Sequence, residues 1–270
     1  MKILLISGHV SGYNYSQNTG YNEGDLNIEL AELVKTQLDP FADVDLYPVE
    51  RNAYIDNKDH NLQLNFSDYD YIFEIHFNAF NGEGRGTSIY LHSDYSDGIS
   101  VEQAIIENMR EIGFKIRGNN GINRKSTLLN MNTAYKLGVD YALIETCFYD
   151  NAEDMKLYHN NKNSVAFAIA DGIIDKFGLT ISNETENEEP TPEEIRGPLY
   201  CVQVSANSKK KYAEAEAYRL EGEGYNSYVK YYPDTGLYHV QAGAFRNYDN
   251  ALALKTSLIS DGFDVFIRRE

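Results

Sequence analysis

The sequence has no tryptophan, only two cysteines, and no apolar run that approaches the ~20 residues needed to cross a bilayer. We therefore expect no membrane partner. Cys147 and Cys201 fall in what we interpret as different domains, so we expect no structural disulfide, which fits a reducing compartment. The apolar stretch at residues 3–6 is too short for the core of a signal peptide, and we interpret it as a buried first strand.

Basic residues are also scarce, with 24 Lys and Arg against 41 Asp and Glu, a formal net charge of −17. The excess of acidic side chains is unevenly distributed along the chain. Residues 1–180 carry 14 basic and 26 acidic side chains, residues 181–197 carry 1 basic and 6 acidic, and residues 198–270 carry 9 of each. Because no basic surface is available to neutralise phosphates, nucleic acid is excluded as a partner. An anionic polymer would have to be recognised by specific contacts or by the neutral C-terminal segment.

An acidic segment divides the chain. Residues 181–197 contain Pro190 and Pro192 and almost no apolar side chain, a composition typical of a solvated, extended tether. We therefore predict an N-terminal domain at 1–180, a linker at 181–197 and a C-terminal domain at 198–270.

Strand and helix patterns alternate along the N-terminal domain. Alternation of this kind predicts an α/β fold, a mixed sheet with helices on both faces, in which ligands gather at the carboxyl ends of the strands. The predicted strands are 2–7, 44–47, 69–76, 86–92 and 141–145, and the predicted helices are 25–38, 99–112 and 153–177.

Four residues lie at such strand ends or at a helix start: His9, Glu23, His76 and Glu145. Two imidazoles and one carboxylate are the ligand set of a catalytic zinc ion that keeps one coordination position open. Glu145 is then a spare carboxylate for general-base work, and its apolar strand would raise its pKa by desolvation. Taken singly, each residue has a structural explanation, for example Glu23 as a carboxylate at a helix N-terminus. Their conjunction favours a single-zinc hydrolase.

Four motifs, in order, resemble the zinc-dependent N-acetylmuramoyl-L-alanine amidases over residues 1–177. They are Ser7-Gly8-His9, the stretch 20–27 around Glu23, the stretch 74–79 around His76 followed by Gly84-Arg85-Gly86, and the stretch 142–151 around Glu145. The resemblance implies one Zn²⁺ bound by His9, Glu23 and His76, with Glu145 catalytic. It also implies hydrolysis of the amide between N-acetylmuramic acid and the first L-alanine of the peptidoglycan stem peptide.

Two further residues are candidates for substrate binding. Asn78 shares a strand face with His76, where it would brace the site, and Arg117 would meet a carboxylate of the stem peptide or else lie on the surface without a role. The chain departs from the family in the loop after His9, which holds Tyr13, Tyr15 and Tyr21 where small residues are usual.

The C-terminal domain contains an internal repeat with an offset of 38 residues, so that 199–206 matches 237–244. Each unit follows the order strand, helix, glycine, strand. Two β-α-β units of this size predict a small α+β domain, a four-stranded antiparallel sheet with both helices on one face. Val240–Phe245 and the repeat resemble the sporulation-related repeat (SPOR) domain, which implies binding to peptidoglycan glycan, especially strands without stem peptides.

Strand alternation assigns the two faces of this sheet. Apolar residues should face the helices: Val202, Val204, Val229, Val240, Val265 and Ile267. The other face would be open, and its amides, rings and guanidinium suit sugar recognition, although a merely solvated face is the alternative. Its members are Cys201, Gln203, Tyr228, Lys230, His239, Gln241, Phe266 and Arg268.

Together the two domains predict a wall-degrading enzyme tethered to its polymer. Without a visible export signal, we expect a phage endolysin that stays in the host cytoplasm until release and then acts on the cell wall. The alternatives are a bacterial autolysin that lyses the mother cell after sporulation, a zinc endopeptidase that cuts within the stem peptide, and a wall-binding protein with an inactive first domain. Host species, stem-peptide type and oligomeric state stay open.

Overall fold

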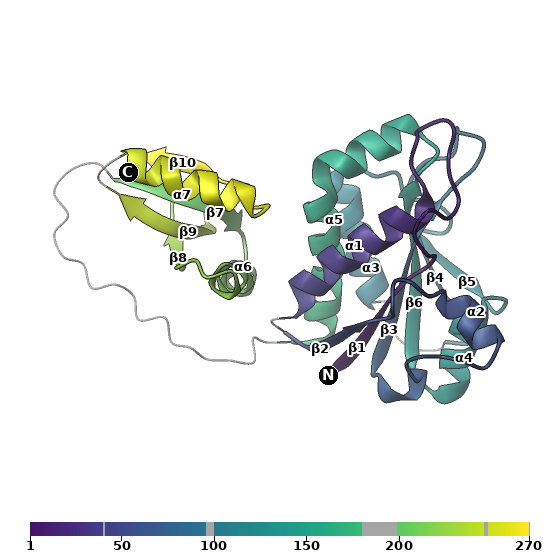
Figure 1. Ribbon diagram of the computed structural model, residues 1–270. Coiled ribbons are helices and arrows are strands. Elements are labelled where there is room, and N and C mark those ends of the chain that lie inside the picture. The colour runs from purple at the N-terminus through teal and green to yellow at the C-terminus, as the bar shows by residue number, and fades with distance from the viewer. Residues whose placement is uncertain (40, 96–99, 180–198, 246–247, 270) are drawn as a thin grey trace. The chain divides into compact units, whose positions relative to one another are not determined.

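A computed structural model describes residues 1–39, 41–95, 100–179, 199–245 and 248–269 (Figure 1). The chain divides into two compact units, Met1–Leu179 and Thr180–Glu270, which we describe separately. The predicted linker, 181–197, lies outside the described residues. Within those residues, no helix combines the length and the apolar character needed to cross a membrane.

The first unit is built on a six-stranded mixed sheet with the strand order β2-β1-β3-β6-β4-β5. Strand β4 runs antiparallel to β6, and all other neighbours are parallel. The central strands are almost continuously apolar, as expected for strands covered on both faces. The strands are β1 (Lys2–Ser7), β2 (Asp43–Leu46), β3 (Tyr71–Asn78), β4 (Ser88–His92), β5 (Ile122–Lys125) and β6 (Asp140–Phe148).

Helices cover both faces of this sheet, which confirms the predicted α/β architecture (Figure 1). One face carries α1 (Glu23–Leu38), α3 (Ser100–Ile112) and α5 (Ala152–Phe177), and the other carries α2 (Ala53–Lys58) and α4 (Leu129–Leu137). A 3₁₀ turn, η1 (Phe66–Asp68), precedes β3. The core on the α2 and α4 face is formed by buried residues that include Leu4, Ile6, Ile72, Tyr141 and Met131.

Among the described residues of this unit, two helices and one strand were not predicted from the sequence, besides the 3₁₀ turn: α2, α4 and β5. Helix α2 has only 6 residues, and β5, with the sequence INRK, carries a single buried apolar residue. Helix α4 buries only Asn130, Met131 and Ala134, so its apolar period is weak. The start of the first helix also differs, because the side chain of Asn22 accepts a hydrogen bond from the Asp25 amide and the helix begins at Glu23.

The carboxyl ends of β1, β3 and β6 lie side by side. Ser7 is in register with Ile75, and His76 is in register with Glu145. The Gly8 amide continues this pairing beyond β1 by donating to the Ile75 carbonyl at 2.9 Å. These three strand ends, together with the N-terminus of α1, form the frame of the candidate site.

The second unit is a four-stranded antiparallel sheet with the order β10-β7-β9-β8 and two helices, as predicted. The repeat is visible in its core, where Ala213 and Leu220 of the first half and Ala251 and Leu258 of the second are all buried. Its elements are β7 (Tyr200–Asn207), α6 (Lys210–Gly222), β8 (Tyr228–Tyr232), β9 (Leu237–Phe245), α7 (Tyr248–Ser260) and β10 (Phe266–Arg269).

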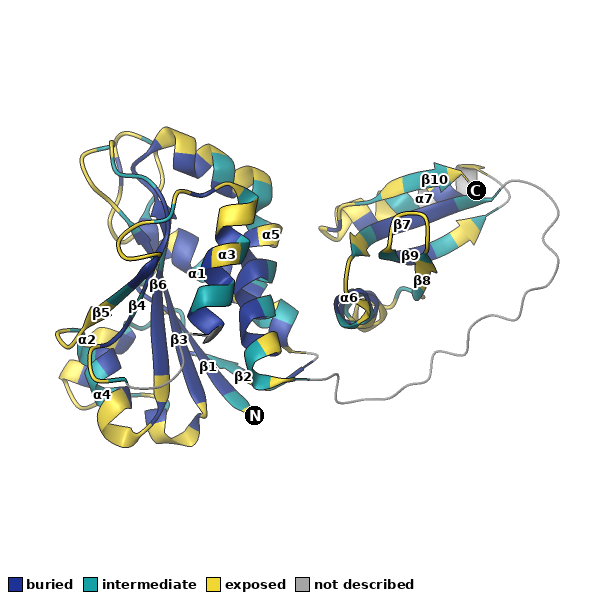
Figure 2. Ribbon diagram, turned by 180° about the vertical axis from the view of Figure 1, so that it is seen from behind, coloured by how far each residue is buried: buried dark blue, intermediate teal, exposed yellow. Residues whose placement is uncertain are grey.

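The apolar face of this sheet is confirmed, but the opposite face is not open as predicted. All six residues assigned to the helix side belong to the core of the second unit or pack against it. On the other side, the middles of β7 and β9 are also buried (Figure 2). The prediction of exposure was wrong for Cys201, Gln203, His239 and Gln241, which are 1%, 1%, 5% and 0% exposed.

Tyr232, which sequence reasoning did not assign to this face, explains part of the burial. Its ring lies 4.2 Å from the ring of His239, and its hydroxyl accepts a hydrogen bond from Gln241 Nε2 at 2.9 Å. The Arg268 guanidinium lies 4.5 Å and the Lys230 ammonium 4.9 Å from the centre of the Tyr232 ring. Long side chains from the edge strands therefore fold over the central strands.

Candidate metal centre

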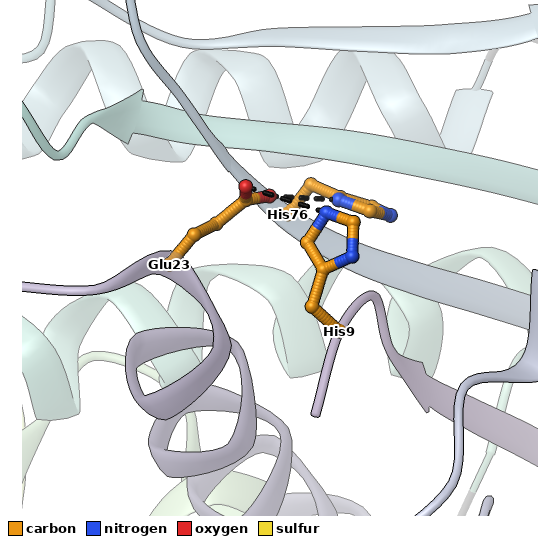
Figure 3. Close-up of side chains that lie close together, drawn as sticks. All are labelled: His9, Glu23 and His76. Atoms are coloured by element: carbon orange, nitrogen blue, oxygen red, sulfur yellow. Dashed lines mark hydrogen bonds and ion pairs between the residues drawn. The ribbon is translucent and has the colours of Figure 1, made fainter. Parts of the chain in front are cut away.

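His9, Glu23 and His76 converge at the carboxyl edge of the first sheet (Figure 3). His9 Nε2 lies 3.3 Å from Glu23 Oε2, and His76 Nδ1 lies 2.9 Å from Glu23 Oε1. One ligand atom from each residue falls within 4.8 Å of the others. The sequence-predicted ligand set is thus brought together by three separate elements: the end of β1, the start of α1 and β3.

Gly8 makes room for this arrangement. A Cβ at position 8 would stand 2.1 Å from Cε1 of His76, so only glycine lets the imidazole pack against the backbone that follows β1. Glu23 opens α1, where the helix dipole favours a carboxylate. Backbone sterics and helix capping therefore decide where two of the three ligands point.

The loop between β1 and α1 closes over two of the ligands. Asn14 Nδ2 donates to Glu23 Oε2 at 2.7 Å, and Asn14 itself has φ +55, a left-handed conformation that asparagine tolerates. The Tyr13 ring stacks on His9 with centroids 4.4 Å apart and remains 47% exposed. The unusual tyrosine noted in this loop is therefore part of the site's wall, while Asn14 is a contact that sequence reasoning missed.

Charge at the site is concentrated in a small buried volume. Burial raises the pKa of Glu23, but hydrogen bonds from His76 and His9 outweigh it and hold that pKa well below its usual range. Burial alone would lower the pKa of His76, but hydrogen bonds to Glu23 and Glu74 raise it well above its usual value. The cluster therefore favours positive charge at its centre.

Glu145 lies one strand away from His76, on β6, and is partly buried. The pKa of Glu145 is raised to about 7, mainly by burial. His76 lowers this pKa, Glu23 raises it, and Lys125 and Arg117 lower it. Its Oε2 atom is buried and has no hydrogen-bond partner among the described residues. An unpaired carboxylate with a pKa near neutrality, beside but outside the ligand cluster, can accept a proton from water.

Glu74, two residues before His76 on β3, was not predicted as part of the site. It is 4% exposed, and its Oε1 lies 2.9 Å from His76 Nε2. The signal was present in the sequence, because a lone carboxylate interrupts the apolar strand and the two-residue spacing places it on the same face as His76.

Asn78 and Arg117 occupy different positions relative to the cluster. The Asn78 side chain accepts a hydrogen bond from the neighbouring Ala79 amide at 2.8 Å, which stabilises the turn after β3. Arg117 is exposed, with its guanidinium 4.3 Å from the centre of the Phe148 ring. The charges of Arg117 and Lys125 both lower the pKa of Glu145.

The polar face of the second unit has a different character. His239 Nδ1 lies 2.8 Å from Gln203 Oε1, and Arg268 lies 3.4 Å from the same nitrogen. Around this buried core, Lys230 and Phe266 are exposed, the latter by 49%, and Tyr228 and Arg268 are half-buried. Aromatic and cationic groups therefore surround two buried amides, and Gln241 Oε1 has no hydrogen-bond partner among the described residues.

The donor set of the first unit fits a zinc ion. Tetrahedral zinc with bonds of about 2.0–2.2 Å separates its ligand atoms by about 3.3 Å. The imidazoles lie 3.3 and 2.9 Å from the two oxygens of Glu23, and one ligand atom of each residue lies within 4.8 Å of the others, which is the right range for a shared ion. Two neutral imidazoles and a carboxylate would leave a divalent ion partly uncompensated. The cluster's preference for positive charge is consistent with such an occupant.

Comparisons with known proteins agree with this geometry. Residues 3–175 match the family model described as N-acetylmuramoyl-L-alanine amidase, and residues 197–269 match that of the SPOR domain. No curated protein sequence gives a significant match.

Solved structures resemble the first unit. The CwlD amidase from Clostridioides difficile, in complex with the GerS lipoprotein, is 18% identical, with a TM-score of 0.54 and coverage of 66% of this chain and 98% of that one. An N-acetylmuramoyl-L-alanine amidase from Clostridium difficile 630 is 21% identical, with a TM-score of 0.53 and coverage of 66% and 96%. The catalytic domain of the CD27L endolysin, targeting Clostridia difficile, is 25% identical, with a TM-score of 0.53 and coverage of 65% and 97%.

Proposed function

The chain belongs to the N-acetylmuramoyl-L-alanine amidase family, and from that premise we propose that it hydrolyses the amide between N-acetylmuramic acid and L-alanine with one zinc ion held by His9, Glu23 and His76. The observation that carries the proposal is the convergence of these three ligands beside an unpaired carboxylate. Zinc bound there would acidify a water molecule and polarise the amide carbonyl.

Glu145 is the general base in this proposal. With a pKa of about 7, it is ready both to take a proton from water and to return it to the departing alanine nitrogen. Its position on β6, in register with His76, keeps it next to the ligands without making it one. Tyr13, stacked on His9 and 47% exposed, forms part of the wall of the site.

Arg117 and Lys125 give the peptide end of the substrate a place to bind. Both are exposed cations whose charges reach Glu145, and stem peptides carry free carboxylates. We assign them to a substrate carboxylate, which a guanidinium and an ammonium can bind together. Asn78, bonded to the turn after β3, supports this edge without contacting substrate.

The second unit binds wall glycan in this proposal, as the SPOR match suggests. The contact residues are the exposed and half-buried members of its polar face: Tyr228, Lys230, Phe266 and Arg268. The buried Gln203, His239 and Gln241 shape this surface from beneath. Binding the polymer raises the local concentration of cleavable amides around the first unit.

We propose a phage endolysin, held in the host cytoplasm until release and then active on the cell wall. The likeness to the catalytic domain of the CD27L endolysin supports this assignment, and a bacterial autolysin of mother-cell lysis is the alternative. Lysis by the purified chain added from outside to intact Gram-positive cells is expected, and a lack of lysis with activity on isolated walls would favour the autolysin.

Mass spectrometry of wall fragments tests the reaction itself. Digestion should release peptides with a free N-terminal L-alanine and leave glycan with intact lactyl groups, and a chelator should abolish it until zinc is restored. New amino termini within the stem peptide would instead identify an endopeptidase. Binding to walls without any cleavage would identify a binding protein with an inactive first unit.

A further inference from the structure

Glu74 is a buried carboxylate inside an apolar strand, and it has three hydrogen-bonding partners. One oxygen, Oε1, lies 2.9 Å from His76 Nε2. The other, Oε2, accepts from Asn130 Nδ2 at 2.9 Å and from the hydroxyl of Tyr141. A buried ionised group costs free energy unless its lone pairs are satisfied in this way. An apolar residue at position 74 would pack in this core at a lower cost, so the carboxylate indicates a functional role.

The contacts of His76 indicate the role of Glu74. Its two ring nitrogens face different carboxylates, with Nδ1 2.9 Å from Glu23 Oε1 and Nε2 2.9 Å from Glu74 Oε1. An ionised carboxylate only accepts hydrogen bonds, so the ring must place a proton on Nε2 to bond Glu74. In a neutral imidazole, Nδ1 then carries the lone pair, and it faces the ligand cluster.

Glu74 is itself fixed by a chain of polar contacts that leads away from the site. Asn130 of α4 accepts from Asn57 Nδ2 of α2 at 2.9 Å, and Asn57 also donates to Thr133 Oγ1 at 3.0 Å. Tyr141, fully buried on β6, holds the same carboxylate oxygen from the neighbouring strand. The orientation of the His76 ring is therefore tied to the helical layer formed by α2 and α4.

We propose that Glu74 is a positioning residue that orients His76 and makes Nδ1, not Nε2, its metal-facing atom, with Asn130 and Tyr141 fixing the carboxylate. The proposal rests on the zinc site of the proposed function. Carboxylates that accept the second ring proton of a ligating histidine raise its basicity and fix its rotation, and their loss weakens metal binding about 10- to 100-fold. Glu74 would act through His76 and touch no substrate.

Zinc affinity measured by competition with a chromophoric chelator tests this role in the full chain. Glu74→Gln keeps the shape of the side chain but removes the charge, and it should raise the zinc dissociation constant about 10- to 100-fold. Glu102→Gln is the matched control, because Glu102 is also buried and accepts from a tyrosine, Tyr71, at 3.0 Å, yet contacts none of the ligands. It should change the dissociation constant less than twofold.

Nitrogen NMR of the zinc-loaded wild-type protein gives a second readout that needs no variant to fold. The His76 ring should carry its proton on Nε2 and bind metal through Nδ1. The proposal is overturned if Nδ1 is protonated, or if Glu74→Gln binds zinc as tightly as the wild type. If the wild type binds no zinc, or binds it equally well after His9→Ala, the proposed metal site fails instead.

Discussion

Each unit of this protein contains a histidine in a polar cluster, His76 partly buried and His239 buried, and the two clusters have opposite electrostatics. His76 lies between two carboxylates, and although burial opposes it, their hydrogen bonds raise its pKa well above the usual value. For His239, burial and the positive charges of Arg268 and Lys230 lower the pKa. Its hydrogen-bond partner is the neutral amide of Gln203.

The difference shows what kind of ligand each cluster can accept. Converging carboxylates and imidazoles favour a cation, whereas an amide network surrounded by Arg268 and Lys230 favours neutral or anionic groups such as hydroxyl, acetamido or carboxylate. In this protein, the candidate metal site is therefore at the histidine whose neighbours supply negative charge.

The sharpest way to break this comparison is to remove one histidine from each unit. His9→Ala should reduce zinc content from one ion per chain to near zero and wall hydrolysis to background, because two ligands cannot hold a catalytic zinc ion. His239→Ala should leave zinc content unchanged, since its partners repel a cation. Elemental analysis of both proteins checks the prediction, and equal zinc loss in the two would contradict it.

The next largest effect distinguishes the role of Glu145 from that of the three proposed zinc ligands. Glu145→Gln should retain one zinc ion but lower the hydrolysis rate about 10²- to 10⁴-fold, the contribution typical of a general base. Glu153→Gln, which changes an exposed carboxylate at the start of α5, is the control and should keep full activity. Release of N-terminal L-alanine from walls measures the rate, and full turnover by Glu145→Gln would refute the assignment.

Glu145→Gln, which should lower activity, should increase the stability of the folded protein. Because the pKa of Glu145 is raised to about 7 by burial, the folded state binds an extra proton between pH about 4.5 and 7. Wild-type stability from this group is thus greatest at low pH and falls as pH rises through 7. In zinc-free protein, Glu145→Gln should be more stable than wild type by roughly 3 kcal/mol at pH 8.

Urea unfolding of zinc-free wild type and Glu145→Gln at pH 4.5 and pH 8 measures this advantage, which should nearly vanish at the lower pH. A difference that does not change with pH would mean that the carboxylate is not held in a desolvated state.

The smallest effect concerns the second unit. Phe266 is 49% exposed on the polar face, and Phe266→Ala should weaken binding to glycan strands about tenfold, the effect of losing one aromatic contact worth about 1.4 kcal/mol. Ile259, equally exposed at 51% but on α7, provides the control. Co-sedimentation with amidase-treated walls should show no loss for Ile259→Ala, and an equal loss in both variants would contradict a specific face.

The sequence was sufficient to predict most of the first site because His9, His76 and Glu145 lie at or near the ends of strongly apolar strands and Glu23 lies at the start of a helix. The position of His76 beside Glu145 follows from two long buried runs that pair in parallel, and strand ends of this kind can be located from pattern alone. Glu74 and Asn14 were missed for different reasons. Glu74 could have been found from the sequence, because a lone carboxylate in an apolar strand calls for an explanation. The contact of Asn14 depends on its left-handed backbone conformation, which hydrophobic periodicity does not predict.

The second unit shows what the alternation of side chains along a strand cannot predict. Period-two reasoning placed Gln203, His239 and Gln241 on the correct side of the sheet, but it could not tell that Tyr232 lies against His239 and Gln241. Side chains that reach across from a neighbouring strand depend on tertiary packing, so exposure is harder to predict than facing direction.

The central claim is one zinc ion held by two imidazoles and a carboxylate, and X-ray diffraction at the zinc absorption edge tests it most directly. The account predicts a single anomalous peak about 2.0–2.2 Å from His9 Nε2, His76 Nδ1 and one oxygen of Glu23. A peak bound by other residues, or no peak in crystals of protein that still cleaves walls, would contradict it.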